Sequence, residues 1–114
     1  MKKSNTSVNF YFLFLFFFGL VYQLPGRSVD SIQSLINSSE GTQKSELLLE
    51  LSEYYLGHLP ERTVELATEA LGLAHKQGNR KLQADAMYNI ADGYRVMGDN
   101  IKALDYFLQS LRIN

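Results

Sequence analysis

Residues 84–114 read ADAMYNIADGYRVMGDNIKALDYFLQSLRIN, and this stretch decides the fold of the chain. Apolar and small residues recur at intervals of three and four on both sides of Gly98-Asp99, which is the spacing of amphipathic α-helices. Glycine readily ends a helix in a left-handed conformation, and aspartate is a good N-cap for the helix that follows. The stretch therefore predicts two antiparallel helices joined by a tight turn at Gly98.

The order of small and large residues in this stretch follows a recognisable pattern. The residues that carry it are Ile90, Ala91 and Tyr94 in the first predicted helix and Ala103, Phe107 and Ser110 in the second. Two helices pack closely only where a small residue faces each large one that inserts. The pattern resembles the tetratricopeptide repeat (TPR) family, with Met87 in place of the family's usual aromatic residue. This resemblance implies a helical solenoid that binds a protein or peptide.

A weaker copy of the same pattern lies upstream. Leu51, Ser52 and Tyr55 lie 39 positions before Ile90, Ala91 and Tyr94. Thr63, Ala67 and Ala70 lie 40 positions before Ala103, Phe107 and Ser110. Self-similarity at a nearly fixed period is the signature of a solenoid. The predicted fold is therefore all-α, an α-solenoid of antiparallel helix pairs with two TPR-like repeats and a short N-terminal helix in front of them.

Caps and breakers predict where the upstream helices begin and end. Ser28 or Asp30 can cap the short N-terminal helix, and Thr42 can cap a helix over residues 43–56. Pro60 suits the first turn of the next helix because its missing N–H would have no intrahelical partner there. That helix ends at Gly78, and the other isolated glycines are likewise interpreted as helix terminators that form no phosphate loop.

These boundaries divide the chain into four segments. They are residues 1–26 as a signal peptide or N-terminal membrane anchor, 27–41 as the short N-terminal helix and a loop, 42–83 as the first repeat and 84–114 as the second.

Residues 1–26 have the layout of a secretory signal peptide. Lys2 and Lys3 precede an uncharged run with a dense apolar centre over residues 10–21. A basic end followed by about 7 to 15 apolar residues is typical of such leaders. The apolar centre is shorter than the roughly 20 residues that span a bilayer, although residues 22–24 could lengthen it. We expect export to the periplasm or cell envelope of a bacterium, with a buried helix or an inner-membrane anchor through residues 10–24 as the alternatives.

Charge and cysteine content exclude several classes of protein. Without Lys2 and Lys3, nine basic residues oppose twelve acidic ones, which is a net charge near −3. Nucleic-acid binding depends on a basic surface, so no nucleic-acid partner is expected. The chain has no cysteine, so it has no disulfide framework and no lipid attachment through a cysteine.

Side chains that could carry chemistry are sparse. His58 and His75 do not share a metal-ligand spacing. Asp85, Asp92 and Asp105 have no histidine, cysteine or lysine partner at a spacing useful for acid–base or nucleophilic chemistry. We therefore expect no catalytic residue, no cofactor, no metal site and no enzymatic activity.

In a solenoid of this kind the binding surface is the concave face, which the first helix of each pair lines. The side chains predicted to bind a peptide there are Glu46, Leu49, Glu53, Leu56, Asp85, Tyr88, Asn89, Asp92 and Arg95. Some TPR proteins grip a peptide's C-terminal carboxylate in this groove with lysine, asparagine and arginine. Here only Asn89 falls on such a position, whereas Leu49 and Glu53 stand where lysine and asparagine would be needed. The predicted ligand is a neutral or basic peptide.

Three glutamates on the first of these helices allow two interpretations. Glu46, Glu50 and Glu53 are spaced by four and three residues, so they share one side of the helix. Like charges this close are mildly destabilising, which could indicate a site for a cation or a basic peptide. The alternative is an ordinary solvated helix face.

The last predicted helix would leave an apolar stripe open at Leu104, Leu108 and Leu111. Each repeat buries its apolar face mainly on its neighbours, so about three or more repeats are normally needed. Further repeats, self-association or a partner could cover the stripe, and a truncated reading frame or a small intact domain could each produce it.

Two hypotheses about function follow. The first is a non-catalytic protein- or peptide-binding TPR module, exported or associated with the cell envelope. The second is the truncated N-terminal sensory region of a membrane histidine kinase or helix-turn-helix regulator in signal transduction. The second rests on resemblance, because exported repeats of this type resemble the N-terminal regions of such sensor proteins.

Overall fold

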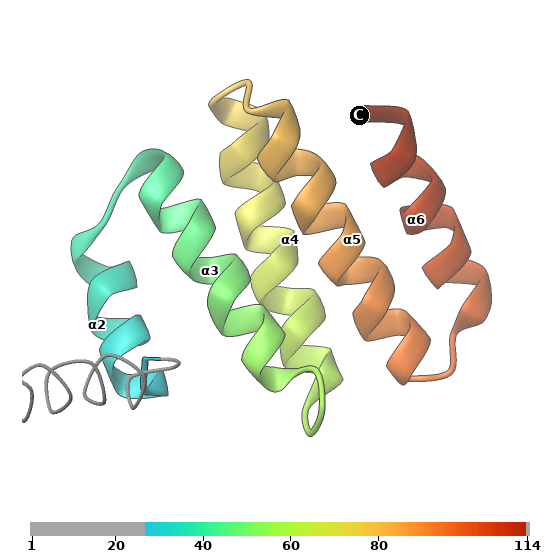
Figure 1. Ribbon diagram of the computed structural model, residues 1–114, viewed down its shortest axis with the longest axis horizontal. Helices are drawn as coiled ribbons and strands as arrows, with labels where there is room; N and C mark the ends of the chain where they lie inside the picture. Colours follow the sequence, from blue (N-terminus) through green and yellow to red (C-terminus); the bar gives the residue numbers. More distant parts are fainter. Residues whose placement is uncertain (1–26, 114) are drawn as a thin grey trace, which may run out of the picture.

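A computed structural model describes residues 27–113, and the predicted leader, residues 1–26, lies outside the described residues. The described part contains five helices, which are α2 (Val29–Ser38), α3 (Gly41–Tyr55), α4 (Pro60–Lys76), α5 (Arg80–Val96) and α6 (Asn100–Ile113). Helices α3 to α6 lie side by side in chain order, each antiparallel to the one before it (Figure 1). The predicted all-α solenoid of helix pairs is confirmed.

Local sequence signals set most of the helix ends. The hydroxyl of Ser28 accepts a hydrogen bond of 3.2 Å from the Ser31 N–H, so Ser28 caps α2 as predicted. Pro60 occupies the first turn of α4. Gly98 has a φ of +87°, and this left-handed conformation turns the chain out of α5. The carboxylate of Asp99 then accepts a hydrogen bond of 3.1 Å from the Lys102 N–H at the start of α6.

Two of the local predictions are wrong. Helix α3 already begins at Gly41, so Thr42 lies inside it, and its hydroxyl donates to Oε1 of Gln77 instead of capping the helix. Gly72 and Gly93 lie inside α4 and α5 and end neither helix. Helix α5 begins at Arg80, four residues before the predicted start of the second repeat at residue 84.

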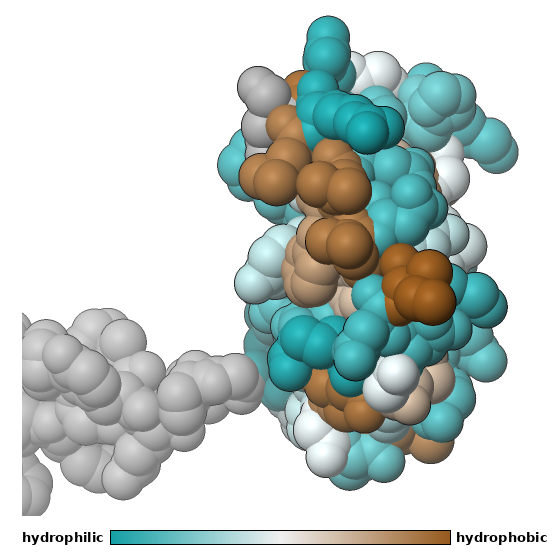
Figure 2. Space-filling model, turned by 90° about the vertical axis from the view of Figure 1, so that its right-hand side faces the viewer, coloured by the Kyte–Doolittle hydropathy of each residue, from teal (hydrophilic) through white to brown (hydrophobic). Residues whose placement is uncertain are grey.

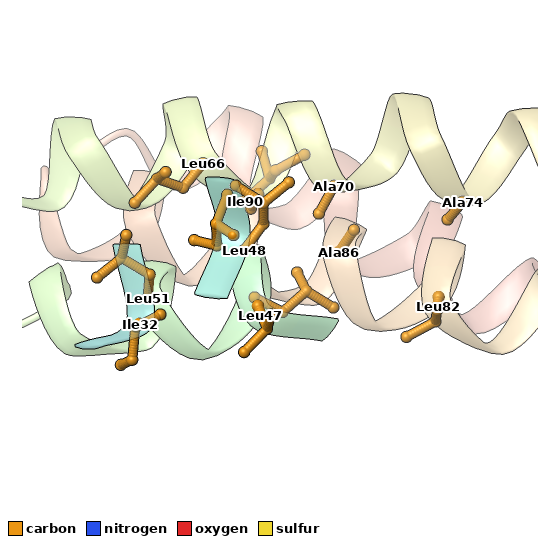
Figure 3. Close-up of a cluster of buried hydrophobic side chains, with 13 residues drawn as sticks. Ile32, Leu47, Leu48, Leu51, Leu66, Ala70, Ala74, Leu82, Ala86 and Ile90 are labelled. Carbon is orange, nitrogen blue, oxygen red and sulfur yellow. The ribbon is translucent and has the colours of Figure 1, made fainter. Parts of the chain in front are cut away.

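The pattern of buried side chains is similar in the two copies of the repeat. Four corresponding pairs are buried in both copies, namely Leu51, Ser52, Thr63 and Ala70 in the first and Ile90, Ala91, Ala103 and Ser110 in the second. Ala67 is also buried, whereas its counterpart Phe107 is half-buried. Tyr55 and Tyr94, which also correspond, are both half-buried beside the core. Figure 3 shows α4 and α5 meeting through small side chains, with Ala70 of α4 across from Ala86 of α5.

Hydroxyl groups at buried small positions bond to the neighbouring helix. Thr63 Oγ1 of α4 donates to the carbonyl oxygen of Ser52 in α3 at 2.7 Å. Ser110 Oγ of α6 donates to the carbonyl oxygen of Ala84 in α5 at 2.8 Å. Within residues 27–113, no buried side-chain nitrogen or oxygen atom lacks a hydrogen-bond partner. These small polar residues therefore pack closely without leaving a polar group unsatisfied.

The outer face of α6 is apolar and exposed. The residues on it are Ile101, Leu104, Leu108 and Leu111, of which Ile101 is 86% exposed and Leu111 is 70% exposed. Figure 2 views the molecule from this side and shows apolar side chains running down the face. None of the helices in the described range is both long enough and apolar enough to cross a lipid bilayer.

Candidate functional site

Helices α3 and α5 border a groove of about 480 Å³. They contact each other directly as well as through α4, so corresponding helices of the two repeats supply its two walls. The residues that line it are Glu46, Leu49, Glu50 and Glu53 from α3 and Lys81, Leu82, Asp85, Tyr88 and Asn89 from α5. Because side chains three and four residues apart share one face of a helix, each wall presents a continuous row to the groove.

The structure brings together most of the side chains predicted for the concave face. Those that line the groove are Glu46, Leu49, Glu53, Asp85, Tyr88 and Asn89. Leu56 lies beyond the end of α3 and does not line it. Asp92 and Arg95 lie farther along α5, where the guanidinium Nε donates to the Asp92 carboxylate at 2.7 Å.

Sequence reasoning did not place Glu50, Lys81 and Leu82 in the groove. Lys81 and Leu82 precede residue 84, the predicted start of the second repeat, whereas α5 begins at Arg80. The signal that could have located them is Asn79, whose side chain accepts a hydrogen bond from the Leu82 N–H and caps the helix. Glu50 belongs to the row of three glutamates, for which the sequence predicts either a site for a cation or basic peptide or a solvated helix face.

The groove is acidic. Four carboxylates, from Glu46, Glu50, Glu53 and Asp85, face one lysine among the lining residues. Lys81 is already paired with Asp85, with 3.1 Å between Nζ and Oδ2. Arg27 approaches Glu50 only to 3.9 Å, and both side chains are exposed. A pair this long and exposed adds little stabilisation, so most of the negative charge on the α3 wall stays uncompensated.

An aromatic ring and an amide stand beside these carboxylates. Tyr88 is 53% exposed and packs against Phe107 of α6, with 5.2 Å between the ring centroids. Asn89 Nδ2 donates to Ser52 Oγ at 3.0 Å, and Ser52 Oγ in turn donates to the carbonyl oxygen of Leu49 at 2.7 Å. One amide hydrogen of Asn89 therefore joins α5 to α3 at the floor of the groove.

The histidines lie away from this groove. His58 follows α3 and packs against Tyr54 and Tyr55, with 5.1 and 5.5 Å between ring centroids. His75 lies in the last turn of α4. Over residues 27–113, no three side chains from histidine, cysteine, aspartate and glutamate are placed to hold a metal ion.

Part of the chain is similar in sequence to a characterised bacterial protein. It is 43% identical over 54 residues to the response regulator aspartate phosphatase A of Bacillus subtilis (strain 168). The matched segment is 47% of this chain but only 14% of that protein. No family model matches the chain. No solved structure matches it significantly.

Proposed function

We propose that this chain is a non-catalytic module of the TPR type that binds a basic peptide in the groove between α3 and α5. The observation that carries the proposal is the uncompensated row of Glu46, Glu50 and Glu53 on one wall, opposite Tyr88 on the other. Carboxylates form charge-assisted hydrogen bonds with arginine and lysine. An exposed aromatic ring adds a favourable surface for the same cations.

The form of the groove suits an extended peptide better than a compact ligand. Its walls are rows of side chains on two neighbouring helices, and the leucines at its floor, Leu49 and Leu82, are buried. Single exposed ion pairs contribute about 0.2–1 kcal/mol, so useful affinity requires several contacts along a peptide. We expect two or more basic residues in the peptide, spaced to meet the glutamates in turn.

Fluorescence anisotropy with labelled peptides tests this proposal. A peptide that alternates lysine or arginine with small residues should bind, and the same peptide with glutamate in place of the basic residues should not. Glu53→Gln and Tyr88→Ala should each weaken binding about two- to fivefold, because each removes about 0.5–1 kcal/mol of interaction. Glu69→Gln is the matched control, because Glu69 is exposed on α4 and does not line the groove. Equal binding of the acidic peptide, or an equal loss with Glu69→Gln, would contradict the proposal.

A role in signal transduction is the second candidate. By its name, the similar Bacillus subtilis protein acts on an aspartate of response regulators, and this is the observation that favours a signalling role here. On this alternative the helical array would be the N-terminal sensory region of a larger signalling protein. Transcript sequencing across the codon for Asn114 tests it, because a reading frame that continues into a kinase or DNA-binding domain is expected, and a stop codon would argue against it.

Export is proposed on the layout of residues 1–26 alone, with the cell envelope as the site of action and an inner-membrane anchor as the alternative. Mass spectrometry of the chain from separated cell fractions tests this. Cleavage near residue 26 in the periplasmic fraction is expected, an intact N-terminus in the membrane fraction would support the anchor, and an intact chain in the cytosol would refute both.

A further inference from the structure

A buried hydroxyl group holds the Asn89 side chain at the floor of the groove. Ser52 of α3 is fully buried, and its Oγ lies 3.0 Å from Asn89 Nδ2 of α5 and 2.7 Å from the carbonyl oxygen of Leu49. The main-chain carbonyl oxygen of Ser52 accepts a further bond of 2.7 Å from Thr63 Oγ1 of α4. Bonds from α4 and α5 therefore meet at Ser52 and fix its position in α3.

The single hydroxyl hydrogen of Ser52 decides which way the Asn89 amide faces. The carbonyl oxygen of Leu49 can only accept, so it takes this hydrogen. Ser52 Oγ is then left as an acceptor, and the Asn89 group beside it must be the NH2 and not the oxygen. The reverse orientation would give the buried hydroxyl one hydrogen bond where the observed one gives it two. The amide is therefore held with Nδ2 toward α3.

The rest of this amide is available to a ligand. Asn89 is half-buried and lines the groove, and its bond to Ser52 uses one of the two hydrogens on Nδ2. Within residues 27–113 every buried side-chain oxygen has a hydrogen-bond partner, and no group donates to Asn89 Oδ1, so this oxygen is accessible. The groove is thus offered one acceptor, Oδ1, and one donor, the second hydrogen of Nδ2.

An acceptor beside a donor complements the main chain of a peptide. Each residue other than proline carries one N–H and one C=O, which match Oδ1 and the remaining hydrogen of Nδ2. A C-terminal carboxylate has only acceptor oxygens, so it offers nothing to Oδ1. Glu53 and Asp85 line the same groove and repel another negative charge. The groove at Asn89 is therefore suited to a segment within a chain and not to its C-terminal end.

On the basis of the peptide-binding function proposed for this groove, we propose that Ser52 positions the Asn89 amide to hydrogen-bond the main chain of the bound peptide. Asn89 Oδ1 accepts from one main-chain N–H, and the second hydrogen of Nδ2 donates to a main-chain carbonyl oxygen. The glutamates of α3 select basic side chains, whereas Asn89 holds the main chain whatever its side chains are. The groove consequently takes an internal basic segment of a protein.

N-methylation of the shortest basic peptide that binds, one residue at a time, tests this contact by fluorescence anisotropy. At one position the methyl group should weaken binding to the unaltered chain about three- to tenfold, because it removes a single N–H donor. The same methyl group should make little difference to Asn89→Ala, which lacks the acceptor. Tyr88→Ala also alters the groove, so it should bind all the peptides more weakly but keep the loss at that position.

Ser52→Ala tests the positioning role, because it removes the acceptor for Nδ2 and leaves Asn89 in the groove. The amide is then free to turn, so the loss caused by N-methylation should fall below about twofold. Ser45→Ala is the matched control, because Ser45 is equally buried on α3 and its hydroxyl bonds to the Gly41 carbonyl oxygen and not to Asn89. It should keep the full loss. A lower stability shared by both variants does not change this ratio of affinities.

Two results would overturn the proposal while leaving the groove as a peptide site. One is equal binding of the parent and every N-methylated peptide, and the other is an undiminished loss in Ser52→Ala. Tighter binding of a peptide with a free C-terminal carboxylate than of its amide would also overturn it, by showing that a chain end occupies the groove. Failure of the basic peptide to bind at all would instead overturn the proposed function, and the contact at Asn89 with it.

Discussion

The hydroxyl of Thr63 in α4 donates a buried hydrogen bond of 2.7 Å to the carbonyl oxygen of Ser52 in α3. In the second repeat, Ala103 occupies the position of Thr63 and Ala91 that of Ser52, and both are buried. The two repeats thus make the same close contact, and the first adds a polar link within the helix pair. Ser52 also accepts a hydrogen bond from Asn89 of α5, so the link extends to the groove.

Replacing Thr63 with valine should lower the free energy of unfolding by about 1–2 kcal/mol. The side chain keeps nearly the same volume, but the carbonyl oxygen of Ser52 loses its bond to the hydroxyl in a buried site. Urea denaturation measures the change. Thr68→Val is the matched control, because the Thr68 hydroxyl bonds to the Val64 carbonyl oxygen on an exposed face of the same helix. An equal loss of unfolding free energy in both variants would show that the buried hydrogen bond contributes no more than the exposed one.

Replacing Gly93 with alanine should destabilise the chain by about 1–3 kcal/mol, because the added methyl group would collide with Val64 Cγ2. Gly72→Ala should instead stabilise it by about 0.5–1 kcal/mol, because a Cβ atom there meets nothing within 4 Å and alanine favours the helix.

Thermal unfolding of Gly93→Ala with and without Val64→Ala locates the collision. The two substitutions should be less harmful together than the sum of their separate effects, because Val64→Ala makes room for the new methyl group. Simple additivity would mean that Gly93 is needed for another reason.

Removing the cap of α6 with Asp99→Ala should lower the free energy of unfolding by about 1 kcal/mol. The carboxylate of Asp99 accepts the bond from the Lys102 N–H at the first turn of the helix. Asp99→Asn keeps an acceptor at the same position and should retain most of the stability. Circular dichroism during denaturation measures both variants, and a loss as large in Asp99→Asn would point to the charge of Asp99 instead of its hydrogen bond.

Binding of a basic peptide in the groove should weaken steeply with salt. The glutamates of the α3 wall are exposed or half-buried, so mobile ions screen them, and the screening length falls from about 10 Å at 0.1 M salt to about 3 Å at 1 M. Anisotropy titrations across this range should show a continuous loss of affinity. A basic peptide that binds equally at both salt concentrations would argue against recognition by the carboxylates.

The sequence alone determined the helices, the turns and the repeat. Ser28, Pro60, Gly98 and Asp99 act on their immediate neighbours, so their effects follow from residues a few positions away. The buried small residues of both copies were predicted for a similar reason, since the spacing of small and large side chains along a helix reports which face another helix must cover.

Only the tertiary structure shows the features that depend on how closely the helices approach one another, which are the tight contact at Gly93 and the residues that line the groove. Gly93 resembles a helix terminator in the sequence, and only the close approach of α4 shows that no larger side chain fits there. Lys81 and Leu82 enter the groove because α5 extends back to Arg80, whereas Asp92 and Arg95 lie farther along the same helix and pair with each other. A side chain's helical face follows from local periodicity, but its neighbours across a groove depend on how far each helix extends and where it crosses the next.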